Sequence, residues 1–347
     1  METEIYVITH KAFTPPEDPI YIPLQVGCDK NPPLEYLRDN TGDNISGKND
    51  RYSELTGLYW LWKNSSFTGN IGINHYRRYF VKDGLRLLDE TDYNSILKDY
   101  DIITSTAMKA KRSYRDFYIS EHDHKQLVLL ENAFRELYPE DLGVYNDCME
   151  GSLFYFGNLF VMKRAEFDIY CEWLFSLLSY VERRLDISMY DEYHRRVFGF
   201  LSEQLLMVWV RKRGLNPYEC KVGLMGDKAE TSELKLAMAQ LIKMEQIEQA
   251  YRMYYEILKL RPDLIRDHSD LSGDLLVIDH LLFIMLEEKR YNTPGLLAYS
   301  HRLSELIDHY KKCEDCLVGS LSGTNEAGEY LESTGVSEAM IRFILSR

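Results

Sequence analysis

A run of polar and aromatic residues that could carry chemistry, His75-Tyr76-Arg77-Arg78, directly follows the apolar segment 70–74. Buried polar groups are costly without partners, so such a cluster at the end of an expected strand marks a candidate site. Two guanidinium groups can neutralise a diphosphate through paired hydrogen bonds and so take the place of a metal ion. The alternative is that Arg77 and Arg78 pair with carboxylates of the protein core.

A second candidate segment, residues 48–54, precedes an expected helix. Free amide groups and the positive end of the helix dipole favour phosphate at a helix N-terminus. Ordinary capping by Asn49 or Ser53 is the alternative, and it does not exclude contact with a ligand. His10 and Lys11 follow the first expected strand, at the edge where open α/β sheets bind ligands.

Two carboxylates, Glu203 and Glu150, are the candidates for a general base, which must lie within hydrogen-bond reach of the reacting hydroxyl group. Glu203 comes first and Glu150 second, because each stands next to an apolar or glycine-rich element. A structural salt bridge to Arg195 or Arg196 is an equally good interpretation of either residue.

The sequence contains no strong metal motif. Asp99-Tyr-Asp101 matches the Asp-x-Asp pattern of a carboxylate pair that holds a divalent ion. However, it precedes its expected strand and so falls at the wrong edge of the sheet. Residues 121–124 are explained equally well as a solvated loop, and Cys313 and Cys316 lack the further ligands that a zinc site needs. We therefore predict no metal site, with Mn²⁺ or Mg²⁺ left open as cofactors.

The elements that must position these residues alternate between strands and helices over residues 1–225, which predicts an α/β sheet domain. Beyond residue 226 no strand pattern returns. One tetratricopeptide-like helix pair ends at Pro262, so we expect an all-helical domain over residues 226–347. The basic, tyrosine-rich stretch 108–118 is expected to be a loop. Apolar runs predict strands at 4–9, 70–74, 101–105 and 152–162, and helical periodicity predicts helices at 53–63, 125–138, 164–185 and about 195–209.

The charge of the chain argues against a general binder of polyanions. Its 41 basic and 55 acidic residues give a net charge of −14, which repels nucleic acid. The sequence shows no secretion signal and no apolar run of membrane-spanning length, so we expect a cytoplasmic protein.

Several ordered blocks of the sequence resemble a bacterial glycosyltransferase family from capsular and exopolysaccharide gene clusters, long catalogued as a domain of unknown function. The blocks lie in the first two-thirds of the chain: Ile8-Thr-His-Lys11, Tyr21-Ile-Pro-Leu-Gln-Val-Gly27, Asn44-Ile-Ser-Gly-Lys-Asn49, residues 52–64, Ile71-Gly-Ile-Asn-His-Tyr-Arg-Arg-Tyr79 and Arg196-Val-Phe-Gly-Phe-Leu-Ser-Glu203. The resemblance implies a GT-A-like nucleotide-diphospho-sugar fold, and some relatives are described as galactosyl- or galactofuranosyltransferases. Residues on family motif positions are His10, Lys48, Asn49, Glu54, Tyr59, Trp60, Lys63, His75, Tyr76, Arg77, Arg78 and Glu203.

The resulting hypothesis is a transferase that moves a sugar from a UDP-sugar to a hydroxyl group of a surface glycan, whose acceptor is often lipid-linked. A peripheral membrane contact would then need a basic patch such as 109–115. The alternative is a non-catalytic scaffold whose helical tail binds a partner protein. Expected catalytic residues are Glu203, His75, Arg77 and Arg78; expected donor-binding residues are His10, Lys11, Lys48, Asn49, Arg51, Glu54, Tyr59, Lys63 and Tyr76; expected acceptor-binding residues are Asn158 and Glu150.

Overall fold

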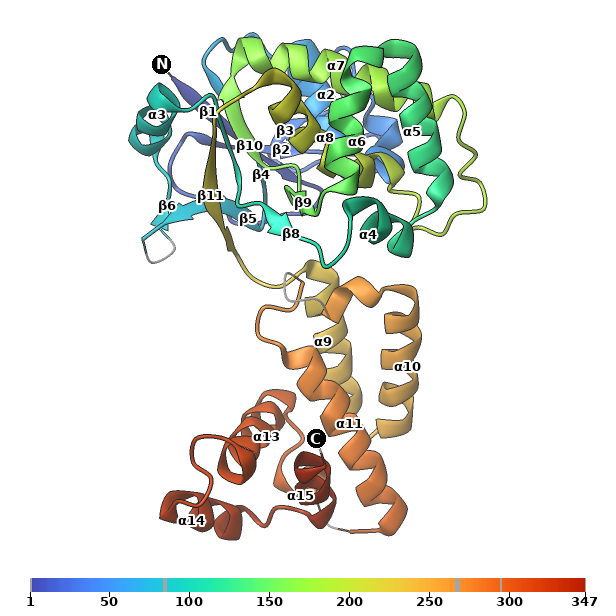
Figure 1. Cartoon of the computed structure of the whole chain (residues 1–347). Coiled ribbons are helices and arrows are strands. Elements are labelled where there is room, and N and C mark those ends of the chain that lie inside the picture. Colours follow the sequence, from blue (N-terminus) through green and yellow to red (C-terminus); the bar gives the residue numbers. More distant parts are fainter. Residues whose placement is uncertain (1, 84–85, 266–268, 294, 347) are drawn as a thin grey trace. The chain divides into compact units, whose positions relative to one another are not determined.

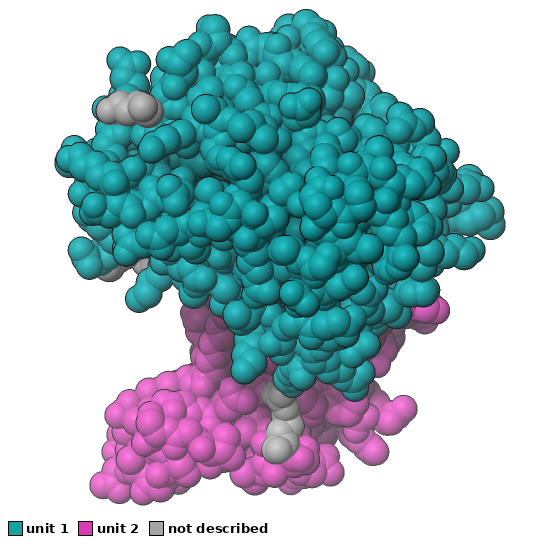
Figure 2. Space-filling model, turned by 45° about the horizontal axis from the view of Figure 1, so that its top comes forward, with its two compact units in different colours: residues 1–225 teal, residues 226–347 magenta. Residues whose placement is uncertain are grey.

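The computed structural model describes residues 2–83, 86–265, 269–293 and 295–346. The chain divides into two compact units, Met1–Met225 and Gly226–Arg347, which Figure 2 distinguishes by colour. The first unit has a mixed α/β architecture, and every element of the second unit in the described ranges is a helix (Figure 1).

The first unit is built on a nine-stranded sheet in the order β3-β2-β1-β4-β10-β7-β11-β5-β6. Strands β1, β2, β3 and β4 run parallel, whereas β10 is antiparallel to both of its neighbours. A separate pair joins β8 to β9. The strands are β1 Thr3–Thr9, β2 Tyr21–Gln25, β3 Leu37–Arg38, β4 Asn70–His75, β5 Arg78–Lys82, β6 Arg86–Leu87, β7 Ile102–Ser105, β8 Met108–Lys109, β9 Leu153–Phe154, β10 Phe160–Lys163 and β11 Pro217–Leu224.

One further pairing closes part of this sheet on itself. His75 at the end of β4 pairs with Arg78 at the start of β5, so that β4, β10, β7, β11 and β5 form a closed ring. The two residues between them, Tyr76 and Arg77, make the connecting turn. The ring therefore closes at the histidine–arginine cluster.

Helices cover both faces of the sheet. Apolar side chains of α2, α5, α6, α7 and α8 form the larger core with one face, and α3 packs on the other face. The longest helix, α7, buries ten of its residues, because its apolar positions run along most of its circumference. The helices are α1 Asn49–Tyr52, α2 Leu55–Asn64, α3 Glu90–Asp99, α4 Tyr114–Glu121, α5 His124–Leu137, α6 Leu142–Glu150, α7 Arg164–Glu182 and α8 Val197–Arg213, with short 3₁₀ turns at Ser46–Lys48 and Pro139–Asp141.

Three local expectations need correction. The stretch 108–118 is not a loop throughout: α4 begins at Tyr114, because Ser113 caps it and Tyr114 and Tyr118 fill the core one turn apart. Strand β11 was not predicted, although Tyr218, Cys220, Val222 and Leu224 alternate there with polar residues or glycine, the period of two that is typical of a strand. The segment 152–162 is two strands, because Gly157 and Asn158 both take positive φ angles, +87° and +51°, and interrupt the extended chain.

The second unit has a core of its own around α11, which contributes Leu275, Ile278, Leu281 and Met285. Helices α9 and α10 pack against each other and against α11, the arrangement that the tetratricopeptide-like pattern predicts. The helices are α9 Ala229–Lys243, α10 Ile247–Leu260, α11 Asp274–Tyr291, α12 Leu296–Tyr299, α13 Leu303–Val318, α14 Asn325–Thr334 and α15 Glu338–Leu345, with a 3₁₀ turn at Pro262–Ile265.

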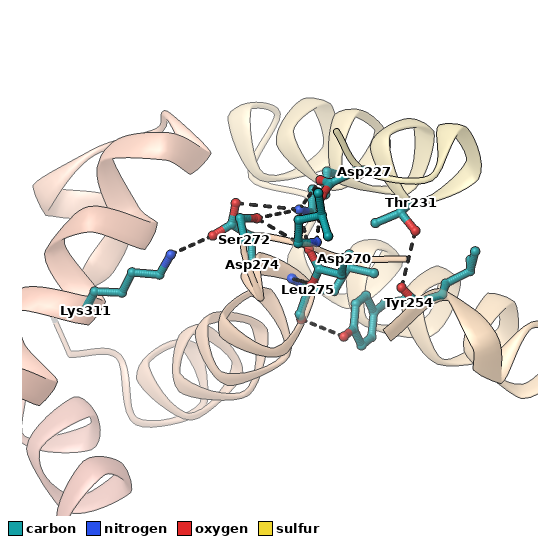
Figure 3. Close-up of polar contacts among 11 residues, drawn as sticks. Asp227, Thr231, Tyr254, Asp270, Ser272, Asp274, Leu275 and Lys311 are labelled. Carbon is teal, nitrogen blue, oxygen red and sulfur yellow. Dashed lines mark hydrogen bonds and ion pairs between the residues drawn. The ribbon is translucent and has the colours of Figure 1, made fainter. Parts of the chain in front are cut away.

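A single ammonium group joins several segments of the second unit (Figure 3). Lys235 Nζ on α9 donates to Asp227 at 2.6 Å, to Asp270 at 2.5 Å and to Ser272 at 2.8 Å. The same nitrogen lies 3.6 Å from Asp274, the first residue of α11. Carboxylates that would repel one another are thereby held together by one partly buried cation.

Among the helices of the described residues, none combines the length and the apolar character needed to cross a bilayer.

Candidate active site

The candidate active site lies where the strand ring closes, at the pairing of β4 with β5, which we call the seam. His75 and Arg78 reach it from the paired ends of β4 and β5. The Gly157–Asn158 turn precedes β10, which runs antiparallel beside β4, and therefore lies at the same edge of the sheet. Glu54 stands at the N-terminus of α2, and Glu203 lies in the second turn of α8.

Asn158 ties three of these elements together. Its side-chain nitrogen donates to Glu54 Oε1 at 2.6 Å and to Ser202 Oγ at 2.8 Å on α8, and the residue is 2% exposed. Asparagine tolerates the left-handed backbone conformation that this turn requires. Asn158 therefore positions Glu54, and its expected role in binding an acceptor stays a prediction.

Two glycines allow the elements to approach closely. A Cβ atom on Gly157 would lie 2.8 Å from Nη1 of Arg78, and a Cβ atom on Gly199 would lie 3.3 Å from Oγ of Ser53. Ser53 itself has a φ angle of +50°, which a residue with a side chain rarely adopts. Strained backbone of this kind occurs often at functional sites.

Arg78 is partly buried, and its guanidinium carbon lies 4.6 Å from the centre of the Phe156 ring. Burial lowers its pKa, and the charges of Glu203 and Glu54 oppose that effect. Within the described ranges these two carboxylates interact with Arg78 only from beyond ion-pairing distance. A partly buried cation without a close counter-ion is costly, so a bound anion would stabilise it.

Burial also shifts the pKa values of Glu203 and His75. It raises the pKa of Glu203 to about 8, and the neighbouring charge of Glu54 acts in the same direction, while Arg78 and Arg196 oppose it. Burial lowers the pKa of His75 to about 4. Nε2 of His75 is buried without a hydrogen-bond partner among the described residues, so it can bind a ligand as a neutral imidazole.

His10 and Tyr76 lie together at the neighbouring strand end. Their rings meet edge to face at 5.8 Å, and Phe13 packs on Tyr76 at 6.0 Å. Arg77 is 8% exposed, and its backbone carbonyl accepts a hydrogen bond from Met225. Lys11 continues the turn after β1, where its N–H donates to Thr9 Oγ1.

In the segment 48–54, the basic side chains of Lys48 and Arg51 contact a carboxylate of α7. Lys48 Nζ lies 2.8 Å from Glu182 and Nη1 of Arg51 lies 3.7 Å from it, at the end of α7. The side chain of Asn49 donates to Ser53 O and to Thr56 Oγ1, which fixes the turn between α1 and α2. These contacts are intramolecular and leave a role in donor binding a prediction.

Tyr59, Lys63 and Glu150 are engaged elsewhere. Tyr59 donates to Asp43 at 3.2 Å, and Lys63 lies over the ring of Trp62 at 3.3 Å. Glu150 is exposed at the end of α6 and pairs with Arg115 at 2.8 Å. None of these contacts joins the seam cluster, whose expected members are His75, Arg78, Glu54, Glu203 and Asn158.

Arg196 lies at this site but was not among the expected site residues. Its Nε donates to Ser53 Oγ at 3.1 Å, and its charge acts on His75, Arg78 and Glu203. The sequence contained one signal for it, namely the spacing of seven residues between Arg196 and Glu203, which places both on one face of a helix.

The described residues contain no group of three or more His, Cys, Asp or Glu side chains arranged to hold a metal ion. Asp101 stands before β7 and accepts a hydrogen bond from the Asn216 N–H. Surface hollows of about 700 Å³ along α10 and about 190 Å³ beside Tyr190 are lined by none of the residues of this site.

The fold and the comparisons define a glycosyltransferase-like protein. The structure is similar to the apo structure of the bifunctional glycosyltransferase WbbM, with 26% sequence identity and a TM-score of 0.61. The match covers 65% of this chain and 46% of that chain, so this protein corresponds to less than half of WbbM. More particularly, the chain belongs to the family described as "Domain of unknown function (DUF4422)", which matches residues 4–214. A comparison with curated proteins gives no match.

Proposed function

We propose that this protein is a glycosyltransferase that moves a sugar from a nucleotide-diphospho-sugar to a hydroxyl group of a glycan acceptor. The observation that carries the proposal is the partly buried guanidinium of Arg78, on which the charges of Glu203 and Glu54 act without an ion pair to either of them among the described residues. A diphosphate leaving group is the kind of anion that such a guanidinium binds through paired hydrogen bonds. The similarity to a glycosyltransferase of known structure supports the same chemistry.

In this proposal Glu203, Arg78 and His75 each have a separate role in the transfer. The carboxylate of Glu203 accepts the proton of the acceptor hydroxyl group as its oxygen bonds to the anomeric carbon of the sugar. The bond from that carbon to the diphosphate breaks, and the nucleoside diphosphate leaves as an anion paired with Arg78. Because the pKa of Glu203 is raised to about 8, its carboxylate is a stronger base than an ordinary one, and the form that can accept a proton predominates above about pH 8. His75 stays neutral and can hydrogen-bond to the substrate.

For the donor we propose a UDP-sugar, with galactose or galactofuranose as the sugar, bound on a GT-A-like fold. The rings of His10, Tyr76 and Phe13 at the end of β1 form an aromatic group on which a nucleotide base could stack. The acceptor in this proposal is a growing surface polysaccharide.

We also propose a peripheral membrane contact through a surface that we call the β8–α4 patch. It consists of Lys109, Lys111 and Arg112, all exposed, together with the apolar side chains of Met108 and Phe117, which are 50% and 39% exposed. Basic groups beside exposed apolar groups suit an anionic bilayer surface.

The proposed function is tested by calorimetric titration of UDP and UDP-galactose into wild type and Arg78→Gln, each with Mn²⁺ and with a chelator. We expect micromolar binding by wild type that persists under chelation and weakens about 10- to 100-fold in the variant, since a charge-assisted contact is lost. Absence of nucleotide binding under every condition would overturn the enzyme proposal and favour the scaffold alternative.

A further inference from the structure

The face of α8 that carries Arg196 is built to lie against the seam cluster. Arg196 is the N-cap residue of this helix, and Gly199 and Glu203 follow it at spacings of three and seven, which place all three on one face. A side chain at Gly199 would lie only 3.3 Å from Ser53 and 3.8 Å from Glu54. The glycine therefore allows the helix to bring Arg196 and Glu203 close to the segment that precedes α2.

Two contacts hold the guanidinium of Arg196 in place. Its Nε–H donates to Ser53 Oγ at 3.1 Å, and its plane lies 5.3 Å from the centre of the Phe200 ring. In the described part of the chain, no carboxylate comes within ion-pairing distance of this guanidinium. Since Nε is engaged by Ser53, the two terminal amino groups are the ones that can form a fork toward a ligand.

The charges of Arg196 and Arg78 act on the same space. Burial is the main cause that lowers the pKa of Arg78, and the charges of Arg77 and Arg196 act in the same direction, while those of Glu203 and Glu54 oppose it. The charges of Arg78 and Arg196 both act to lower the pKa values of His75 and Glu203. Two like charges that act on the same groups repel each other, so an anion between them would relieve the repulsion as well as form new hydrogen bonds.

We infer that Arg78 and Arg196 are the two guanidinium groups that grip the diphosphate of the donor, so that the pair is built from β5 and α8 rather than from the adjacent Arg77 and Arg78. This inference rests on the proposed function and names a further donor-binding residue of the same site. Arg77 is buried, with 8% of its surface exposed, whereas Arg78 and Arg196 are each partly exposed and so accessible to a ligand. The fork of Arg196 approaches from a helix, which allows it to face Arg78 across the ligand.

The test is a calorimetric titration of UDP and, separately, of uridine into wild type, Arg78→Gln, Arg196→Gln and Arg195→Gln. Arg195 is the matched control, because it is adjacent in sequence, exposed, and donates from Nε to Tyr190 O at 2.9 Å. We expect Arg196→Gln to weaken UDP binding about 10- to 100-fold, as Arg78→Gln does, and to leave uridine binding within about twofold of wild type. Arg195→Gln should bind both compounds like wild type.

Each other outcome has a distinct meaning. If Arg196→Gln binds UDP like wild type while Arg78→Gln binds it weakly, the inference is overturned and the proposed function stands. If Arg196→Gln weakens UDP and uridine equally, its role is structural and the inference is again overturned. If wild type binds neither UDP nor another nucleoside diphosphate, the proposed function fails, and the inference with it. Thermal unfolding of each variant, with Arg196→Lys as a charge-conserving variant, establishes that the proteins compared are folded.

Discussion

At the scale of single residues, Glu203 occupies a position where its negative charge is unfavourable. Its carboxyl group is enclosed by α8, by the Gly157 backbone and by the charged residues Glu54, Arg78 and Arg196. Buried Tyr114 and Tyr118 on α4 interact with the same carboxylate. The folded protein therefore holds a proton on Glu203 at a pH at which the unfolded chain has released it.

We expect Glu203→Gln to raise the unfolding temperature relative to wild type at pH 9, with the difference shrinking toward pH 5. The pKa is raised from 4.5 to about 8, so the stability contributed by this group is complete below about pH 4.5 and is lost as the pH rises through about 8. Glutamine is neutral throughout. Thermal unfolding followed by circular dichroism between pH 5 and pH 9 measures the effect, and the exposed Glu150→Gln is the control. A constant difference across this range would contradict the raised pKa.

Sequence reasoning found His75, Arg78 and Glu203 because polar groups after an apolar strand, or on an apolar helix, stand out against their neighbours. It considered Arg196 only as a salt-bridge partner of Glu203 or Glu150. The local sequence does not show which strand end a helix far along the chain will face. Residues such as Lys48 and Lys63 have the right chemistry, but the structure gives them intramolecular contacts that depend on three-dimensional packing.

At the scale of elements, the turn before β10 lies directly beside the guanidinium of Arg78. Gly157 has a φ angle of +87°, and a Cβ atom there would meet Nη1 of Arg78 at 2.8 Å. The turn therefore requires glycine both for its backbone conformation and for the space beside the guanidinium.

We expect Gly157→Ala to destabilise the protein by about 1–3 kcal/mol and to weaken UDP binding, because it strains the turn and displaces Arg78. Gly143→Ala is a matched control: this glycine lies in α6 with no atom within 4 Å of its added Cβ, so alanine should stabilise the helix by about 0.5–1 kcal/mol. Chemical denaturation and UDP titration of both variants give the two quantities. Equal stability of Gly157→Ala and wild type would show that the turn relaxes without cost.

Strands β1, β4 and β7 and helices α2, α5, α7 and α8 could be predicted from periodicity, because each buries one continuous apolar face or run. Strand β11 was overlooked although its apolar residues alternate, and its pairing with β7 and β5 is what makes it part of the sheet. The closed ring could not be predicted, because it depends on a long-range arrangement of strands that no local sequence pattern encodes.

At the scale of the whole molecule, the net charge of −14 opposes contact with an anionic bilayer, so any attraction must be local. The β8–α4 patch is such a local exception. Attraction of this kind acts only over short distances at physiological salt. A weak, salt-dependent association is therefore the form that a membrane contact would take.

We expect wild type to float with vesicles that contain about one-third phosphatidylglycerol at low salt, and to remain unbound to pure phosphatidylcholine vesicles. Lys109→Glu/Lys111→Glu should lower the membrane partition constant by about 30-fold or more, because each basic residue near the surface contributes about 1 kcal/mol. The control, Lys243→Glu/Lys259→Glu, changes the net charge equally at exposed positions of the second unit. Equal losses in both double variants would show that only the total charge matters and that the patch has no special role.

The Lys235 cluster has a consequence for how the second unit is maintained. In many small helical proteins a divalent ion gathers acidic loops, and their cohesion then varies with the supply of that ion. Here the counter-charge is part of the polypeptide, with Asp227, Asp270 and Asp274 around one amino group. The Lys235 cluster therefore forms as soon as the chain folds, and chelators or changes in ion concentration do not remove its counter-charge.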